Sequence, residues 1–202
     1  MSEPPAAVEH TGDEMLRLFV AIELPADWRH ELVRRRRLLE RRLGEAADAL
    51  RWVGEEALHL TLVFLGNVPA AREPAVHAAI ATALASTPRL TLTLADLGTF
   101  GGQRPRVLWN GIGGDLDALS RLHARLAAGL QPGERARFSP HITLARVREG
   151  RQIGVEPRAA LANWPRGGPE PFTVQGVSLI RSRLLPGGPV YTRRLLVPLI
   201  SG

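Results

Sequence analysis

The sequence contains no cysteine and no lysine, and both absences limit the chemistry open to it. Without cysteine there is no disulfide, no thiolate nucleophile and no zinc site built on thiolates. No apolar run is long enough for a membrane-spanning helix. Residues 1–14 are polar and acidic and lack the apolar stretch of a secretory signal. We therefore expect a cytoplasmic protein with no membrane partner and a disordered tail over residues 1–14.

The basic residues are 26 arginines, set against 20 acidic residues, which gives a formal net charge of +6. A GC-rich genome explains such arginine usage without any functional reason. The functional explanation is a phosphate-bearing partner, because the guanidinium group matches phosphate oxygens. Charge alone does not separate the two explanations, although it makes a nucleic acid a reasonable partner.

Hydrophobic residues make up 45% of the 202 residues, enough for one large domain or two small lobes packed together. Alternation and helical spacing of the apolar residues predict the secondary structure. The expected strands cover 16–24, 58–65, 90–97, 107–112, 141–147, 172–181 and 190–198, and the expected helices cover 28–43, 73–86 and 116–130. We expect a turn at Gly66-Asn67, and a hairpin turn around Pro186-Gly187-Gly188 between the last two strands.

The order of these elements repeats. A strand, a helix and then a strand containing His-x-Thr-Leu occur in the first half, and the same series occurs in the second. The repeat predicts an α+β fold with two pseudo-symmetric lobes, each an antiparallel sheet with outer helices, around a central cleft. No Gly-Ser linker separates the halves, so we expect residues 15–202 to form a single bilobal domain.

The repeated motif is His59-Leu60-Thr61-Leu62 in the first half and His141-Ile142-Thr143-Leu144 in the second. Side chains two residues apart on a strand point to the same face. Each strand therefore presents an imidazole and a hydroxyl on one face and anchors its aliphatic residues on the other. Two such copies arise by chance in about one sequence of this composition in a thousand, by counting matches to the template.

Two imidazoles and two hydroxyls facing one cleft suit the cleavage of a phosphodiester. One neutral imidazole can deprotonate the attacking oxygen while one imidazolium protonates the leaving oxygen. The threonine hydroxyls can donate to the non-bridging oxygens of the phosphate. The remaining histidines have no acidic partner at metal-ligand spacing, so we expect neither a metal nor any other cofactor.

At these residues the chain resembles the 2H phosphoesterase superfamily, and within it the RNA 2',3'-cyclic phosphodiesterases, also called 2'-5' RNA ligases. The resemblance extends from Arg17 to the C-terminus. Its matching segments are Arg17 to Ile22, Leu58 to Gly66, Arg106 to Trp109 and Phe138 to Arg146.

The resemblance implies metal-independent hydrolysis of RNA 2',3'-cyclic phosphate ends to 2'-phosphates. It implies that His59 is the proton donor and His141 the proton acceptor, although their spacing alone treats the two as interchangeable. Thr61 and Thr143 would hold the phosphate. The resemblance adds Arg146 as a phosphate contact, but strand alternation points Arg146 away from His141 unless a bulge reverses it. Further candidate RNA contacts are Phe19, Arg104, Arg106 and Arg137, for which core packing or surface charge is the alternative explanation.

Several alternatives remain open from the sequence. The same residues could run the reaction in reverse and join RNA fragments by a 2'-5' bond. The fold could also serve as an RNA or nucleotide binding module without turnover, or act on a small cyclic phosphate. The expected partners are RNA 3' ends with a cyclic phosphate, including tRNA fragments or nucleotides, and we expect a monomer.

Overall fold

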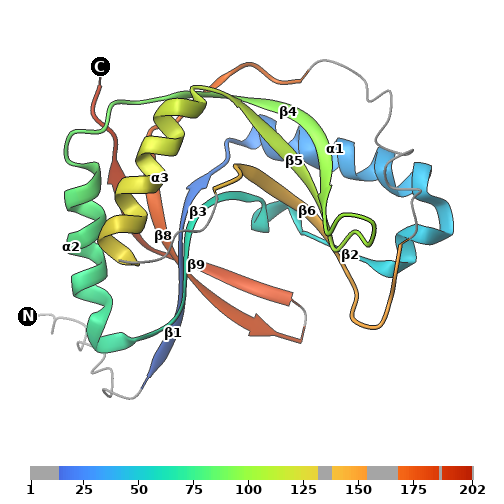
Figure 1. Ribbon diagram of the computed structural model, residues 1–202, viewed down its shortest axis with the longest axis horizontal. Helices are drawn as coiled ribbons and strands as arrows, with labels where there is room; N and C mark the ends of the chain where they lie inside the picture. Colours follow the sequence, from blue (N-terminus) through green and yellow to red (C-terminus); the bar gives the residue numbers. More distant parts are fainter. Residues whose placement is uncertain (1–13, 132–137, 154–167, 187, 202) are drawn as a thin grey trace, which may run out of the picture.

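The computed structural model describes residues 14–131, 138–153, 168–186 and 188–201 (Figure 1). The expected tail, residues 1–14, lies outside these ranges except for Glu14, whose backbone carbonyl accepts a hydrogen bond from the amide of Ala70. Arg137 also lies outside them. No helix in the described ranges is long and apolar enough to cross a membrane.

Nine strands and three α-helices form within the described residues. The strands are β1 (Met15–Glu23), β2 (Leu50–Trp52), β3 (His59–Pro69), β4 (Thr91–Phe100), β5 (Val107–Gly114), β6 (His141–Val147), β7 (Phe172–Thr173), β8 (Gly176–Leu185) and β9 (Gly188–Pro198). The α-helices are α1 (Ala26–Leu43), α2 (Glu73–Leu84) and α3 (Leu116–Leu130), and short 3-10 turns η1 (Gly44–Ala49), η2 (Glu55–Ala57) and η3 (Ala70–Arg72) lie between elements.

The strands form one curled antiparallel sheet in the order β7-β4-β5-β6-β3-β1-β8-β9, and β2 pairs with β6. The order is symmetric about its centre, where β3 and β6, both fully described, meet through the single pair Leu60 and Ile142. On one side lie β3, β1, β8 and β9, and on the other lie β6, β5, β4 and β7. The predicted α+β fold with two pseudo-symmetric lobes is therefore confirmed.

Each repeat contributes its helix to the opposite lobe (Figure 1). Helix α1 follows β1 but packs over β4, β5 and β7. Its buried Arg35 donates to the carbonyl of Ala95 and to the side chain of Asn110, and its Trp28 packs edge-on against Phe172. Helix α3 follows β5 but packs against α2 and β3. This exchange ties the lobes together, since the helix of each half is held by strands of the other.

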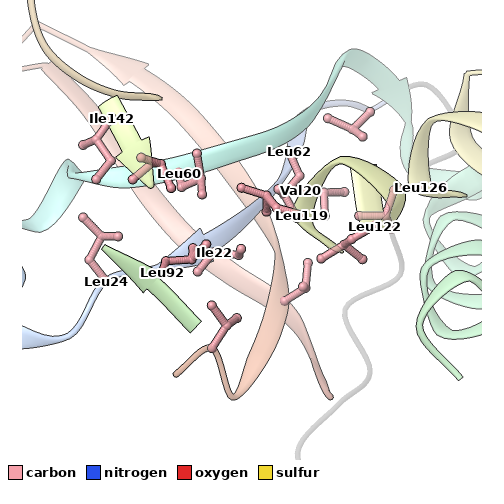
Figure 2. Packing of buried hydrophobic residues seen from close by; sticks show 14 of the residues in the cluster. Val20, Ile22, Leu24, Leu60, Leu62, Leu92, Leu119, Leu122, Leu126 and Ile142 are labelled. Atoms are coloured by element: carbon pink, nitrogen blue, oxygen red, sulfur yellow. The ribbon is translucent and has the colours of Figure 1, made fainter. Parts of the chain in front are cut away.

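One apolar core is continuous across both lobes (Figure 2). Leu60 and Ile142, the aliphatic residues inside the two His-x-Thr motifs, are fully buried in it. The stripe of α3 formed by Leu119, Leu122 and Leu126 packs into the same core, as the helical spacing predicts. Burial of alternate residues therefore fixes the face on which each motif presents its histidine and threonine.

Two local expectations are wrong, and one short strand was not anticipated. The turn expected at Gly66-Asn67 is absent, because β3 runs on to Pro69 and the positive φ of Gly66 (68°) accommodates a β-bulge opposite β1. The strand expected over 172–181 is interrupted, so that β7 pairs with β4 while β8 pairs with β1. Strand β2 was not expected, since its three residues are too few to show a period.

Candidate active site

The pairing of Leu60 with Ile142 brings the two histidine motifs together. In an antiparallel ladder this register sets His59 across from Thr143 and Thr61 across from His141. All four side chains line one cleft of about 550 Å³. The structure therefore joins the four residues that the repeat singled out, with two imidazoles and two hydroxyls on one face.

Both imidazole rings are held by the backbone in the same way. The Nδ1 atom of His59 lies 2.8 Å from the carbonyl oxygen of Ala57, and Nδ1 of His141 lies 2.7 Å from that of Ser139. A carbonyl oxygen only accepts, so Nδ1 carries the proton and donates in each case. In the neutral ring the lone pair is then on Nε2. Each histidine thus has its Nε2 left for chemistry and its orientation fixed.

Aromatic rings wall both histidines. The ring of His59 lies 4.7 Å from Phe19 and 5.4 Å from Tyr191, measured between centroids. Phe19 is 3% exposed and still lines the cleft, so it both packs in the core and supports the imidazole.

The ring of His141 has a comparable wall on the other lobe. Its centroid lies 4.8 Å from Phe100 and 6.3 Å from Trp109. Trp109 lies over Gly98 on the neighbouring strand, where a Cβ atom would come within 2.3 Å of the indole ring. A glycine at position 98 is thus required for the tryptophan that backs His141.

Burial lowers the pKa of both histidines below the usual value for the side chain. The backbone hydrogen bonds at Nδ1 oppose this effect. The positive charge of Arg146 lowers both pKa values further, and the charge of His141 lowers that of His59. The negative charge of Glu23 raises the pKa of His59 alone. The two imidazoles are chemically similar but electrostatically unequal.

Arg146 lines the cleft with the histidines, because β6 contains a bulge. Trp109 on β5 pairs with Thr143, and Leu108, the residue before Trp109, pairs with Ala145. Leu144 is therefore the extra residue on β6. A bulge shifts the alternation by one position, and Leu144 and Ala145 are accordingly both buried. Arg146 returns to the face of His141, as the family resemblance requires and simple alternation does not.

Strand β3 has the same bulge at the equivalent place. Val20 pairs with Val63 and Ala21 with Thr61, which leaves Leu62 as the extra residue. Phe64 is therefore the counterpart of Arg146 and also lines the cleft. The guanidinium of Arg17 lies 4.6 Å from the centroid of the Phe64 ring. Leu184 and Leu185 add further apolar surface to the cleft lining.

The other predicted RNA contacts lie away from the cleft or outside the described residues. Arg104 and Arg106 are exposed on and beside the turn between β4 and β5, and neither is in the cleft lining. Contact of these arginines and of Arg137 with RNA stays a prediction. Within the described ranges, no group of three or more His, Asp or Glu side chains is placed to hold a metal ion.

Sequence reasoning missed several residues that line the cleft: Arg17, Arg51, Phe64 and Tyr191. A usable signal existed for Phe64, since it follows His59 by the same interval at which Arg146 follows His141. Tyr191 comes from β9, far along the chain, and nothing local marks it. Arg51 lies on β2, the strand too short to predict.

Comparison with known proteins now identifies the family. The profile of the 2'-5' RNA ligase superfamily matches residues 24–184. The RNA 2',3'-cyclic phosphodiesterase of Geobacillus stearothermophilus is 35% identical over 140 residues, which are 65% of this chain and 42% of that protein. The chain thus spans less than half the length of this relative. The RNA 2',3'-cyclic phosphodiesterase of Escherichia coli K12 is 34% identical over 175 residues, 84% of this chain and 92% of that protein.

A solved structure supports the same assignment. The structure of Escherichia coli LigT complexed with 3'-AMP is 30% identical in sequence and superposes with a TM-score of 0.70, covering 92% of this chain and 99% of LigT. A profile match over most of the chain, a relative above 30% identity and a shared fold agree. The chain belongs to the 2'-5' RNA ligase superfamily, a branch of the 2H phosphoesterases.

Proposed function

We propose that the protein hydrolyses 2',3'-cyclic phosphate ends of RNA to 2'-phosphates, with His59 as proton donor and His141 as proton acceptor. One observation carries the proposal. Two imidazoles from pseudo-symmetric strands line one cleft, and each is fixed through Nδ1 so that Nε2 is left for the substrate. An acid and a base on opposite sides of one phosphorus atom are what ring opening needs.

In the proposed reaction, Nε2 of His141 takes a proton from water as the water oxygen attacks phosphorus. The bond from phosphorus to the 3' oxygen breaks, and protonated Nε2 of His59 gives its proton to that oxygen. The products are a free 3' hydroxyl and a 2'-phosphate. His59 ends neutral and His141 ends protonated, so one proton exchange with solvent restores the starting state.

Thr61, Thr143 and Arg146 are the proposed phosphate-binding residues. Both hydroxyls can donate to the non-bridging oxygens, on which negative charge grows as water attacks. The guanidinium of Arg146 can donate two parallel hydrogen bonds to the same group. All three line the cleft beside the histidines. Since these side chains can stabilise the negative charge on the phosphate, we propose that the reaction needs no metal ion.

The surroundings of the two histidines differ by one negative charge. Burial and the positive charges of Arg146 and His141 lower the pKa of His59, and Glu23, which faces His59 across the β1–β3 ladder, opposes them. Burial and Arg146 also lower the pKa of His141. The assignment of donor and acceptor therefore follows the family resemblance, and Glu23 is the charge that favours a protonated His59.

The relatives support the choice of substrate. The Geobacillus and Escherichia coli relatives are RNA 2',3'-cyclic phosphodiesterases by name, and LigT has been solved with 3'-AMP. We propose RNA 3' ends, including tRNA fragments and nucleotides, as the substrates of this chain. We also propose that the protein acts as a monomer.

The test is to incubate the purified protein in EDTA with a short RNA that ends in a 2',3'-cyclic phosphate and to identify the product. The proposal expects a 2'-phosphate, formed at the same rate without EDTA. Failure of the ring to open, a 3'-phosphate product or dependence on added metal would each refute it. Adding a fragment with a 5' hydroxyl tests the reverse direction, in which a 2'-5' linked product would show ligation. Tight RNA binding without turnover would instead favour a binding module.

A further inference from the structure

Two arginines stand side by side at one end of the cleft. Arg51 on β2 pairs directly with Arg146 on β6, and both residues line the cleft. Side chains directly opposite one another in an antiparallel pair lie on the same face and close together. Like charges in that arrangement destabilise the pair of strands unless an opposite charge lies between or beside them.

The described part of the chain supplies no such opposite charge. Neither Arg51 nor Arg146 has a hydrogen bond or an ion pair with any described residue, and no acidic residue is among the described residues that line the cleft. Glu23 accepts from Ser178 and Arg193. Arg17, the third cleft arginine, differs because its guanidinium stacks on Phe64. Arg51 and Arg146 are thus a pair of cations prepared for anions from a ligand.

The two arginines are not equivalent with respect to the reacting centre. Arg146 lies close enough to the histidines for its charge to lower the pKa of both. Arg51 lies on β2, which pairs with the same edge of β6 as β3 does, and paired strands are about 4.8 Å apart. The proposed site of the reacting phosphate is already served by two threonines and Arg146, so Arg51 is placed for a different phosphate.

We infer that Arg51 binds the phosphodiester that joins the terminal nucleotide to the one before it. This inference rests on the proposed function, and it makes a chain of at least two nucleotides a better substrate than a cyclic mononucleotide. The remaining arginine of the cleft, Arg17, is held against the ring of Phe64, whereas Arg51 stands beside Arg146. The cleft volume of about 550 Å³ lies in the middle of the range for ligand sites.

Three substrates separate the two phosphate positions: a nucleoside 2',3'-cyclic phosphate, a dinucleotide that ends in a 2',3'-cyclic phosphate, and the same dinucleotide with an uncharged methylphosphonate at the internal linkage. The turnover of each substrate is measured with the wild type, with Arg51→Ala and Arg51→Lys, and with the control Arg41→Ala. Arg41 is exposed on α1 and does not line the cleft. It therefore reports the loss of one surface charge alone.

We expect Arg51→Ala to lower kcat/KM on the charged dinucleotide about 10-fold or more, the usual effect of losing a hydrogen bond to a charged group. On the cyclic mononucleotide and on the methylphosphonate it should stay within about 2-fold of wild type, the range of a neutral surface substitution. Arg51→Lys should recover part of the loss. The slope of log kcat/KM against log salt for the dinucleotide should fall by about 0.7, as for one phosphate contact on a single strand.

An equal loss on all three substrates would overturn the inference, because Arg51 would then serve the reacting phosphate. No loss on the charged dinucleotide would overturn it as well. If wild type turns over none of them, the proposed function fails by itself. Binding of the dinucleotide 2'-phosphate, measured by calorimetry, then still tests Arg51: an Arg51→Ala affinity equal to wild type contradicts the inference, and a loss of about 10-fold confined to the charged linkage supports it.

Discussion

Phe64 and Arg146 occupy equivalent places in the two halves of the molecule. Each follows its histidine by the same interval, each lies beyond an equivalent bulge, and each lines the cleft. One is aromatic and the other cationic, so a pseudo-symmetric frame carries an asymmetric site. The asymmetry places a cation in one half of the cleft where the other half has an aromatic ring, and the charge of that cation acts on both histidines.

The first prediction concerns the effect of the Arg146 charge on the two histidines. The charge of Arg146 lowers the pKa of both histidines, so Arg146→Gln should raise both. The base is active above its pKa and the acid below its own, so both limbs of the profile of kcat/KM against pH should move to higher pH. NMR titration of the imidazoles measures the same shift directly. Arg41→Gln is the control, and a profile that does not move, or moves to lower pH, would count against the electrostatic role.

The second prediction concerns the two hydroxyls. Thr61→Val and Thr143→Val keep the shape of the side chain and remove its donor, and each should lower kcat/KM about 100-fold, as the loss of one transition-state donor does. Thr61→Ser and Thr143→Ser retain the donor and should stay much closer to wild type. Steady-state assays on the cyclic-phosphate RNA decide the matter. Valine variants as active as the serine variants would remove the hydroxyls from the mechanism.

The third prediction separates the acid from the base. A cyclic substrate in which sulfur replaces the 3' oxygen has a leaving group that needs no proton. His59→Ala should therefore regain most of its activity on this substrate, whereas His141→Ala should remain impaired because water still has to be deprotonated. Rescue of His141→Ala in place of His59→Ala would reverse the proposed roles.

The fourth prediction concerns the helix exchange between the lobes. Arg35 is 3% exposed and bonds Glu31, Asn110 and the carbonyl of Ala95. Arg35→Ala leaves the buried Oδ1 of Asn110 without its donor and removes one of the donors to Glu31 and to the carbonyl of Ala95, so it should lower the free energy of unfolding by about 2–4 kcal/mol. Its neighbour Arg34 makes an exposed pair with Glu31, so Arg34→Ala should cost less than about 1 kcal/mol. Urea denaturation measures both, and equal costs would show that Arg35 does not anchor α1.

Much of the fold could be predicted because its signals are local and repeated. The periods of apolar residues located β1, β3, β6 and all three helices, and the repeated strand–helix–strand order anticipated the two lobes. The alternation within His59 to Leu62 placed the histidine and threonine on the cleft face, since burial of Leu60 leaves no other orientation.

The rest could not be predicted because it depends on breaks in the pattern or on distant segments. The bulge at Leu144 decides where Arg146 points, and the residue types at that position do not indicate a bulge. Arg51 is brought to the cleft by the pairing of β2 with β6, where it lies opposite Arg146, and this pairing cannot be read from the local sequence. Tyr191 reaches His59 from the C-terminal hairpin, and the exchange of α1 and α3 between lobes is a matter of tertiary packing.

The central claim is that His59 and His141 act together in one ring-opening step, and a double-mutant cycle tests it most directly. Single-turnover rates on the cyclic-phosphate RNA are compared for wild type, His59→Ala, His141→Ala and the double variant. We predict that each single variant loses about 100-fold or more. The double variant should lose little beyond that, because groups that act as a unit are not additive. Full activity in either single variant, or losses that simply multiply in the double variant, would contradict the claim.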